Sequence, residues 1–213
     1  TYERIPAHIY EDEEAASERL ADKITADINA RGGVFRLGLT TGSSPISLYR
    51  GLVKRYKAGE VSFKNVQIYS IDEYYPAPAD SHSRNRRLYE EFVSKVDVKP
   101  ENVHVPKLTE IMDSEAVTEF CAQYDKMASG LDLLIMGTGE KGQVGFNEAG
   151  ASDKSRTRTV LLPYGSRKRQ AKNFAGDVKS TPDKAIAMGI STMLSAKKIN
   201  LIAWGEDKAE VVK

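Results

Sequence analysis

The sequence of 213 residues contains a single cysteine, Cys121, which excludes an internal disulfide framework and a cysteine-based zinc site. The sequence also has no large excess of positive or negative residues. It contains 31 Lys and Arg and 30 Asp and Glu, which give a net charge of +1. Such a balance offers no large field to attract nucleic acid or an anionic membrane. No apolar run approaches the roughly 20 residues that span a bilayer. We therefore expect a cytoplasmic protein without nucleic-acid or membrane partners.

Hydrophobic residues make up 40% of the chain and charged residues 29%, which is typical of a globular protein. The chain begins Thr1-Tyr2-Glu3, without a signal-peptide pattern. It stops at Val211-Val212-Lys213, inside what reads as the start of a helix. No internal repeat or low-complexity linker divides it. We therefore expect residues 1–213 to form a single domain that lacks its C-terminal end.

Short runs rich in β-forming residues alternate along the chain with segments of helical periodicity. The expected strands are 5–10, 34–39, 66–71, 102–105, 131–136, 157–162 and 199–204. The expected helices are 12–30, 45–53, 84–96, 113–127 and 184–198. Such alternation is typical of βαβ units, in which the strands run parallel and helices pack on the sheet. The pattern predicts an α/β fold with a mostly parallel sheet that has helices on both faces.

In open α/β sheets, ligands bind outside the carboxyl ends of the strands. The first notable strand exit is Thr40-Thr41-Gly42-Ser43-Ser44-Pro45, where small residues lead into an expected helix. Backbone N–H groups in such a turn can bind an anion. The segment lacks the lysine and the spacing of a P-loop. A tight strand-to-helix turn without a ligand is therefore an equally good interpretation.

The second strand exit carries two adjacent acids, Asp72 and Glu73, after the apolar strand at 66–71. Burying a carboxylate is costly, so we expect these side chains to face a cleft or to be paired. An ionised Asp72 at this place could act as a general base. The alternative is that the acids cap a helix or begin a solvated loop.

The third strand exit is the glycine-rich segment 137–148, with four glycines in its first nine positions. Glycine at this density indicates close backbone approach or positive φ angles. Glu148, at the end of the segment, is a second candidate acid. The alternative is an ordinary surface loop.

The remaining ionisable groups give weaker signals. We expect His8 and His104 to be structural, whereas His82, in the loop after Asp72, could approach the site. The basic run at 84–87 indicates a solvated helix face. No HExxH motif or paired His/Asp spacing is present, so no metal is predicted.

Together, the three strand exits resemble the motifs of one family. Segment 37–45 with Ser47-Leu48-Tyr49, segment 71–74 and segment 137–148 are similar, in this order, to the signatures of the glucosamine-6-phosphate deaminases. These enzymes are also called isomerases and are related to the 6-phosphogluconolactonases. Segments 155–158 and 187–190 are further matches, and the resemblance covers essentially the whole chain. Phe146-Asn147-Glu148 favours the deaminase branch over the lactonase branch.

The resemblance implies a Rossmann-like sheet and a deaminase/isomerase-type hydrolase without a redox cofactor. Such an enzyme converts glucosamine 6-phosphate to fructose 6-phosphate and ammonia. Asp72 would then move a proton between C2 and C1 of the opened sugar, and Glu148 would belong to the ring-opening group. The residues implied to bind the phosphate are Thr41, Gly42, Ser43, Ser44, Lys208 and Lys172, the last where the family often has arginine. Whether the substrate is the gluco or the galacto epimer stays open, as does the oligomeric state, a homo-oligomer included.

The third motif departs from the family pattern, because Lys141-Gly142-Gln143 stands where the family usually has Asp-Gly-His. That histidine is the acid–base that opens the sugar ring, and the Asp and Glu148 orient it. Gln143 has no titratable proton, and losing a general acid–base costs roughly 10²–10⁴-fold in rate. Lys141 also places a positive charge where the family usually has the negative charge of the aspartate. Three interpretations stay open: an amino-sugar-phosphate deaminase or isomerase, a non-catalytic sugar-phosphate-binding relative, and a lactonase-like hydrolase.

Overall fold

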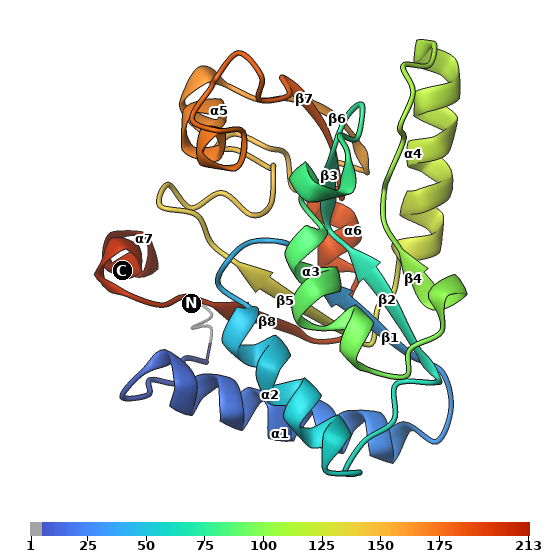
Figure 1. Cartoon of the computed structure of the whole chain (residues 1–213), viewed down its shortest axis with the longest axis vertical. Helices are drawn as coiled ribbons and strands as arrows, with labels where there is room; N and C mark the ends of the chain where they lie inside the picture. The colour runs from blue at the N-terminus through green and yellow to red at the C-terminus, as the bar shows by residue number, and fades with distance from the viewer. Residues whose placement is uncertain (1–5) are drawn as a thin grey trace.

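The computed structural model describes residues 6–213 (Figure 1). The helices are α1 (Glu13–Arg31), α2 (Ile46–Lys57), α3 (Arg86–Glu91), α4 (Ser114–Ala128), α5 (Tyr164–Gln170), α6 (Ile190–Leu194) and α7 (Ala209–Val212). The strands are β1 (Phe35–Leu39), β2 (Val66–Ser70), β3 (Asp72–Tyr74), β4 (Val103–His104), β5 (Leu133–Gly137), β6 (Arg158–Leu161), β7 (Lys184–Ala187) and β8 (Ile199–Ile202). Short 3-10 helices are η1 (Asp80–His82), η2 (Val93–Lys95), η3 (Pro100–Asn102), η4 (Ala171–Asn173) and η5 (Glu206–Lys208).

The central sheet has five parallel strands in the order β4-β2-β1-β5-β8. β1 lies in the middle, with Phe35 opposite Val66 and Leu37 opposite Leu133. Every residue of β1 except Arg36 is buried, as expected for a strand that is covered on both faces. The expectation of a mostly parallel α/β sheet is confirmed.

Two apolar clusters fix helices to the two faces of this sheet. On one face, α1, α2 and α3 pack on Leu37 and Ile68 through side chains that include Ile24, Leu52 and Leu88. On the other face, α4 and α6 pack on the sheet residues Tyr69 and Leu134 through Tyr124, Ala128 and Met193. Figure 1 shows α1 and α2 side by side below the sheet, and α4 apart from them. The helices therefore cover both faces, as the alternation predicts.

The boundaries of α1 follow from its capping residues. The Asp12 side chain accepts a hydrogen bond from the Ala15 N–H at 2.7 Å, which caps the first turn. Gly32 ends the helix in the left-handed conformation, with φ 63°. α2 begins one residue later than expected, because Pro45 occupies its N-cap position.

No helix within residues 6–213 has the length and apolar character needed to cross a membrane.

A second sheet, with the antiparallel order β3-β7-β6, is a feature that the sequence pattern did not predict. The expected helix at 184–198 is wrong: its first part is β7 and only Ile190–Leu194 is helical. Residues 185–187 are fully buried in β7, which lies between β3 and β6. A short apolar run of this kind has no periodicity by which a strand could be told from a helix in the sequence. A Cβ at Gly189 would lie 2.1 Å from the Ser155 carbonyl oxygen, so only glycine fits where β7 ends.

Three smaller expectations also differ from the structure. The expected strand at 5–10 is absent from residues 6–10, and Ile5 lies outside the described residues. His8 is exposed there rather than structural, whereas His104 stacks on Tyr69 with ring centroids 4.7 Å apart. The expected helix at 84–96 is reduced to α3 followed by η2.

The two sheets meet at Ile71, immediately before Asp72. The Ile71 N–H donates to the Leu39 carbonyl in the parallel sheet at 3.2 Å. The Ile71 carbonyl accepts from the Met188 N–H, next to β7, at 2.8 Å. The chain therefore leaves the first sheet and enters the second within one residue, and Asp72 lies at their junction.

Candidate functional site

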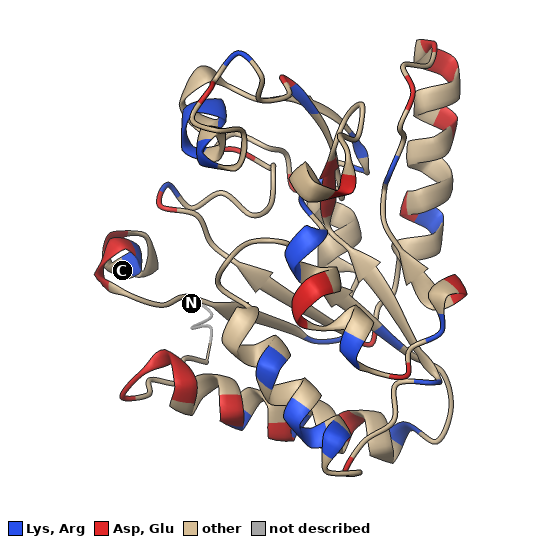
Figure 2. Ribbon diagram, in the orientation of Figure 1, with Lys and Arg blue, Asp and Glu red and all other residues tan. Residues whose placement is uncertain are grey.

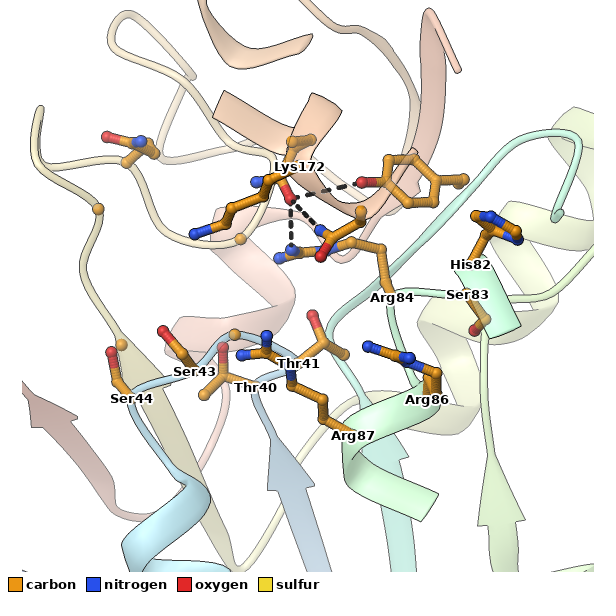
Figure 3. A pocket seen from close by; sticks show the side chains of 18 of the residues that line it. Thr40, Thr41, Ser43, Ser44, His82, Ser83, Arg84, Arg86, Arg87 and Lys172 are labelled. Carbon is orange, nitrogen blue, oxygen red and sulfur yellow. Dashed lines mark hydrogen bonds between the residues drawn. The ribbon is translucent and has the colours of Figure 1, made fainter. Parts of the chain in front are cut away.

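A cavity of about 210 Å³ lies at the carboxyl ends of β1 and β5, beside the junction of the two sheets. Three of its walls come from the segments 40–44, 81–87 and 137–145. Lys172 from η4 (Figure 3) and Lys208 from η5 also line it, as do Tyr74, Gln170 and Asn173. The structure therefore brings together residues from strand exits that lie far apart in the sequence, at the place where α/β sheets bind ligands.

The 40–44 loop, between β1 and α2, is held by residues on either side of it. The Tyr49 hydroxyl donates to the Thr40 carbonyl, and Trp204 Nε1 donates to the Ser44 carbonyl at 2.7 Å. Within residues 6–213, the N–H groups of Gly42, Ser43 and Ser44 donate to no other group. A fixed loop with free N–H groups and hydroxyls at a cavity wall is suited to hold an anion.

Positive side chains surround this loop. Lys172 and Lys208 line the cavity, as do three arginines from the run at 84–87. Figure 2 shows Lys and Arg at the start of α3 and along α5, and Figure 3 places Lys172 across the cavity from Thr40. Lys208 is only 14% exposed and lies 2.9 Å from Asp207. No carboxylate side chain contributes to the lining among the described residues.

The prediction that the run at 84–87 is a solvated helix face is wrong. Arg84 is only 14% exposed, and its guanidinium carbon lies 4.7 Å from the centre of the Phe146 ring. Arg86 and Arg87 point from α3 into the cavity (Figure 3). The signal that could have located them is their position, because α3 begins directly after the loop that follows Asp72. Charge alone did not distinguish this arrangement from a helix face in water.

Asp72 is fully buried and paired, which is one of the two expected arrangements. Its Oδ1 accepts a hydrogen bond from the Thr41 hydroxyl at 2.6 Å and lies 3.5 Å from Arg84 Nε. Its Oδ2 has no hydrogen-bond partner among the described residues, and a Cβ at Gly145 would lie 2.8 Å from it. Asp72 does not line the cavity, but Thr41, Arg84 and Gly145, which cover it, do.

Glu73 positions the arginine that pairs with Asp72. Its buried carboxylate accepts hydrogen bonds from the backbone N–H of Arg84 at 2.9 Å, from Asn85 Nδ2 at 3.0 Å and from the Ser83 hydroxyl. These bonds fix the turn that leads into α3. Burial alone would lower the pKa of Arg84, but the negative charge of Asp72 raises it above its ordinary value. Arg84 therefore stays charged beside the carboxylate.

The three residues at the positions of the family's ring-opening group, Lys141, Gln143 and Glu148, do not converge. Gln143 lines the cavity, and its Oε1 accepts from the Lys141 N–H at 3.0 Å. Lys141 is exposed and its side chain is not part of the lining. Glu148 also lies outside the lining, where it accepts a hydrogen bond from the Ser166 hydroxyl and lies 3.9 Å from Arg169. Only Gln143 of these three faces the cavity.

Two further titratable residues line the cavity. Burial raises the pKa of Tyr74 to about 12, so its hydroxyl stays protonated and donates to Gln170 at 3.5 Å. His82, in η1, stacks on Phe174 with ring centroids 5.2 Å apart. Figure 3 shows His82 at the end of the cavity away from Ser43 and Ser44. In the part of the chain that the structure describes, no three His, Cys, Asp or Glu side chains gather as metal ligands.

Comparison with known proteins assigns the chain to a family. Residues 11–213 match the family described as glucosamine-6-phosphate isomerases/6-phosphogluconolactonase. The chain belongs to this family. A glucosamine-6-phosphate deaminase of Beutenbergia cavernae is 42% identical over 180 residues, which are 83% of this chain and 67% of that protein. A glucosamine-6-phosphate isomerase of Candida albicans is 38% identical over 94% of this chain and 81% of that protein.

The chain spans 32% of a longer family relative, a glucosamine-6-phosphate deaminase-like protein of Bacteroides thetaiotaomicron, to which it is 36% identical over 99% of its own length. A solved monomeric glucosamine-6-phosphate deaminase superposes with a TM-score of 0.86 and 31% identity, over 95% of this chain and 83% of that one. The 6-phosphogluconolactonase of Thermotoga maritima, at 16% identity, has a TM-score of 0.72 over 96% of this chain and 86% of that one. The lactonase therefore shares the family fold.

Proposed function

We propose that the cavity binds the phosphate of an amino-sugar phosphate and that the protein is a deaminase/isomerase. The reaction would convert glucosamine 6-phosphate or galactosamine 6-phosphate to a ketohexose 6-phosphate and ammonia. The observation that carries this proposal is the convergence of the 40–44 loop, Lys172 and Lys208 on one cavity that lies over the carboxylate of Asp72. The relatives at 38–42% identity are named deaminase or isomerase and favour this chemistry, whereas the 6-phosphogluconolactonase of Thermotoga maritima, at 16% identity, supports the shared fold alone.

The phosphate would lie on the 40–44 loop. The free N–H groups of Gly42, Ser43 and Ser44 supply donors, and the serine hydroxyls add two more. Lys172 and Lys208 would place positive charge beside the phosphate, whose own charge is about −2 near neutral pH, and Asp207, 2.9 Å from Lys208, offsets part of it. Hydrogen bonds to charged groups are among the stronger ones in proteins, so this end of the substrate would supply most of the binding.

Asp72 would act as the base that transfers the proton between C2 and C1 of the opened sugar. Thr41 occupies one carboxylate oxygen, which leaves Oδ2 as the atom that accepts the proton. A general base must come within hydrogen-bond reach of the substrate, and Asp72 is fully covered. Its action therefore requires that Arg84 or the segment around Gly145 moves aside when the substrate binds.

Ring opening is the step for which the family's usual residue is missing. Gln143 can donate and accept hydrogen bonds in the cavity but cannot carry a proton. The enzyme would act on the open-chain sugar that forms spontaneously, or His82 would supply the proton. Histidine is the side chain suited to proton transfer near neutral pH, and His82 lines the same cavity.

A non-catalytic sugar-phosphate-binding protein is the second candidate function. It is favoured by two observations, the full burial of Asp72 and the place of Gln143 in the cavity. Binding needs the 40–44 loop and its lysines but no general acid or base. This alternative predicts micromolar affinity for amino-sugar phosphates without turnover.

Ammonia release from glucosamine 6-phosphate, with galactosamine 6-phosphate in parallel, separates the two functions. Asp72→Asn is the blank, and Asp183→Asn, an exposed acid outside the cavity, is the matched control. Release by the wild type and the control, well above the blank, supports the deaminase. Binding of both sugars without release supports the binding protein. Absence of both binding and release would refute the proposed site.

A further inference from the structure

Arg87 is a cation of the cavity wall without a partner in the protein. Among residues 6–213, its guanidinium donates no hydrogen bond and has no carboxylate oxygen within 4.0 Å. The side chain is nevertheless partly buried and lines the cavity. By contrast, Arg84 lies beside Asp72 and donates to the Gln170 side chain at 3.3 Å. The guanidinium of Arg87 is therefore available to a ligand in the cavity.

The Arg87 side chain lies beside the loop on which we place the phosphate. Figure 3 draws its guanidinium between Thr40 and Thr41, whereas Arg86 lies on the His82 side of Thr41. Lys172 faces the same loop from across the cavity, which holds only about 210 Å³. An anion on the free N–H groups of residues 42–44 would therefore lie between Arg87 and Lys172.

Arg87 extends from a helix that is fixed at both ends. The Glu73 carboxylate holds the turn before α3 through three hydrogen bonds. Near the end of α3, Arg50 donates two hydrogen bonds to Glu91, at 3.1 and 3.0 Å. Leu88, next to Arg87, is fully buried in the core. A donor on a fixed backbone loses less freedom when it binds a ligand, so this placement favours binding.

We propose that Arg87 binds the phosphate of the sugar phosphate directly, together with the 40–44 loop and Lys172. The inference rests on the proposed function, since the phosphate must occupy that loop. Arginine suits this role because its planar guanidinium donates two parallel hydrogen bonds to a phosphate. Arg87 would also supply charge that Lys208 gives only in part, because Asp207 lies 2.9 Å from that lysine. The phosphate at C6 of a hexosamine is remote from the amino group at C2, so Arg87 would not face the amino group.

Calorimetric titration with two open-chain ligands tests the proposal. The ligands are glucitol 6-phosphate and 2-amino-2-deoxyglucitol 6-phosphate, which lack the carbonyl needed for reaction and differ only in the group at C2. Arg87→Gln should weaken the binding of both by the same factor, about 10- to 100-fold, which is the effect of hydrogen bonds to a charged group. Arg87→Lys should lose less, because the charge stays and only the paired hydrogen bonds are lost.

The neighbouring arginine provides a matched control. Arg86→Gln removes the same charge from the same helix and the same cavity, and should cost less than about 3-fold for either ligand, since that side chain would act only through its field. Arg19→Gln, which removes an exposed charge on α1, should leave both affinities unchanged. Because Arg87 has no partner among the described residues, Arg87→Gln should melt at the wild-type temperature without ligand, which separates a binding role from a structural one.

Several results would overturn the role of Arg87. Wild-type affinities in Arg87→Gln refute it and leave the proposed phosphate site intact. Equal losses in Arg86→Gln and Arg87→Gln would mean that both act through the general field of the cavity. A loss for glucitol 6-phosphate alone would place Arg87 beside C2 instead of the phosphate.

The same titrations separate this inference from the proposed function. If neither ligand binds the wild type, the phosphate site and the role of Arg87 both fail. If Arg87→Gln weakens both ligands as expected but the wild type releases no ammonia from amino-sugar phosphates, Arg87 is supported and only the deaminase chemistry is refuted.

Discussion

Removing the arginine that covers Asp72 should destabilise the protein through the charge it leaves behind. The Arg84 Nε lies 3.5 Å from Asp72 Oδ1, with side-chain exposures of 14% and 0%. At this distance and an effective dielectric constant of about 20, the attraction between unit charges is about 5 kcal/mol. Breaking a buried pair typically costs about 3–5 kcal/mol, because one charge stays buried without its partner. We expect Arg84→Met to lower the free energy of unfolding by about this amount.

The double variant separates the charge from the packing of Arg84. Methionine keeps an apolar chain beside Phe146, so the loss of the cation–π contact should add only about 1 kcal/mol. In an Asp72→Asn background, the remaining amide is neutral and Arg84→Met should cost about 1–2 kcal/mol. The coupling between the two positions should therefore be about 2–3 kcal/mol.

Urea unfolding at pH 7 measures all four proteins. The midpoints should shift while the slopes stay equal, which identifies a change in stability rather than in the unfolded state. Arg19→Met, on the exposed side of α1, controls for replacing an arginine by methionine. If Arg84→Met costs the same in both backgrounds, Arg84 acts through packing alone and the account of the buried pair is refuted.

Three further predictions concern other parts of the molecule. Gln143→His introduces an acid–base into the cavity and should raise kcat for ammonia release, by up to about 10²-fold, with a new pH dependence near neutrality; an unchanged kcat and pH profile would contradict this. Although burial raises the pKa of Asp125, hydrogen bonds from Thr192 and Thr157 lower it overall. The stabilisation from Asp125 should be complete above its unfolded pKa of about 4 and should decline as the pH falls through its lower pKa in the folded state. In Asp125→Asn, the free energy of unfolding measured by urea should therefore fall less steeply as the pH is lowered. Gly189→Ala, whose Cβ would lie 2.1 Å from a backbone oxygen, should cost at least about 3 kcal/mol in urea unfolding, whereas Gly33→Ala, with open space around it, should cost far less.

The core strands and long helices followed from local pattern. β1 and β5 were predicted as short apolar runs, and α1 and α4 from their periodicity, because each must bury an apolar side against the sheet. The site was predicted in part for the same reason: parallel strands end at one edge, so the 40–44 loop and the glycine-rich segment had to lie close together.

The pairing of β3 with β7 could not be read from either segment alone. Asp72 lies opposite Ala187, far along the chain, and both segments are short enough to form a strand or a helical turn. The burial of Asp72 follows from that pairing and from the turn before α3, which places Arg84 beside it. The same docking of α3 turned an apparently solvated basic run into part of the cavity wall.

By itself, the sequence determined the parallel α/β sheet, the order of its motifs and the residue types at three strand exits, since local periodicity and backbone preference suffice for these. Only the tertiary structure decided which charges face the cavity. It buried Asp72 beneath Arg84, kept Glu148 and Lys141 away from the lining, and directed Arg86 and Arg87 into it. These outcomes depend on contacts between segments distant in sequence, where burial and pairing set the energy of each charge.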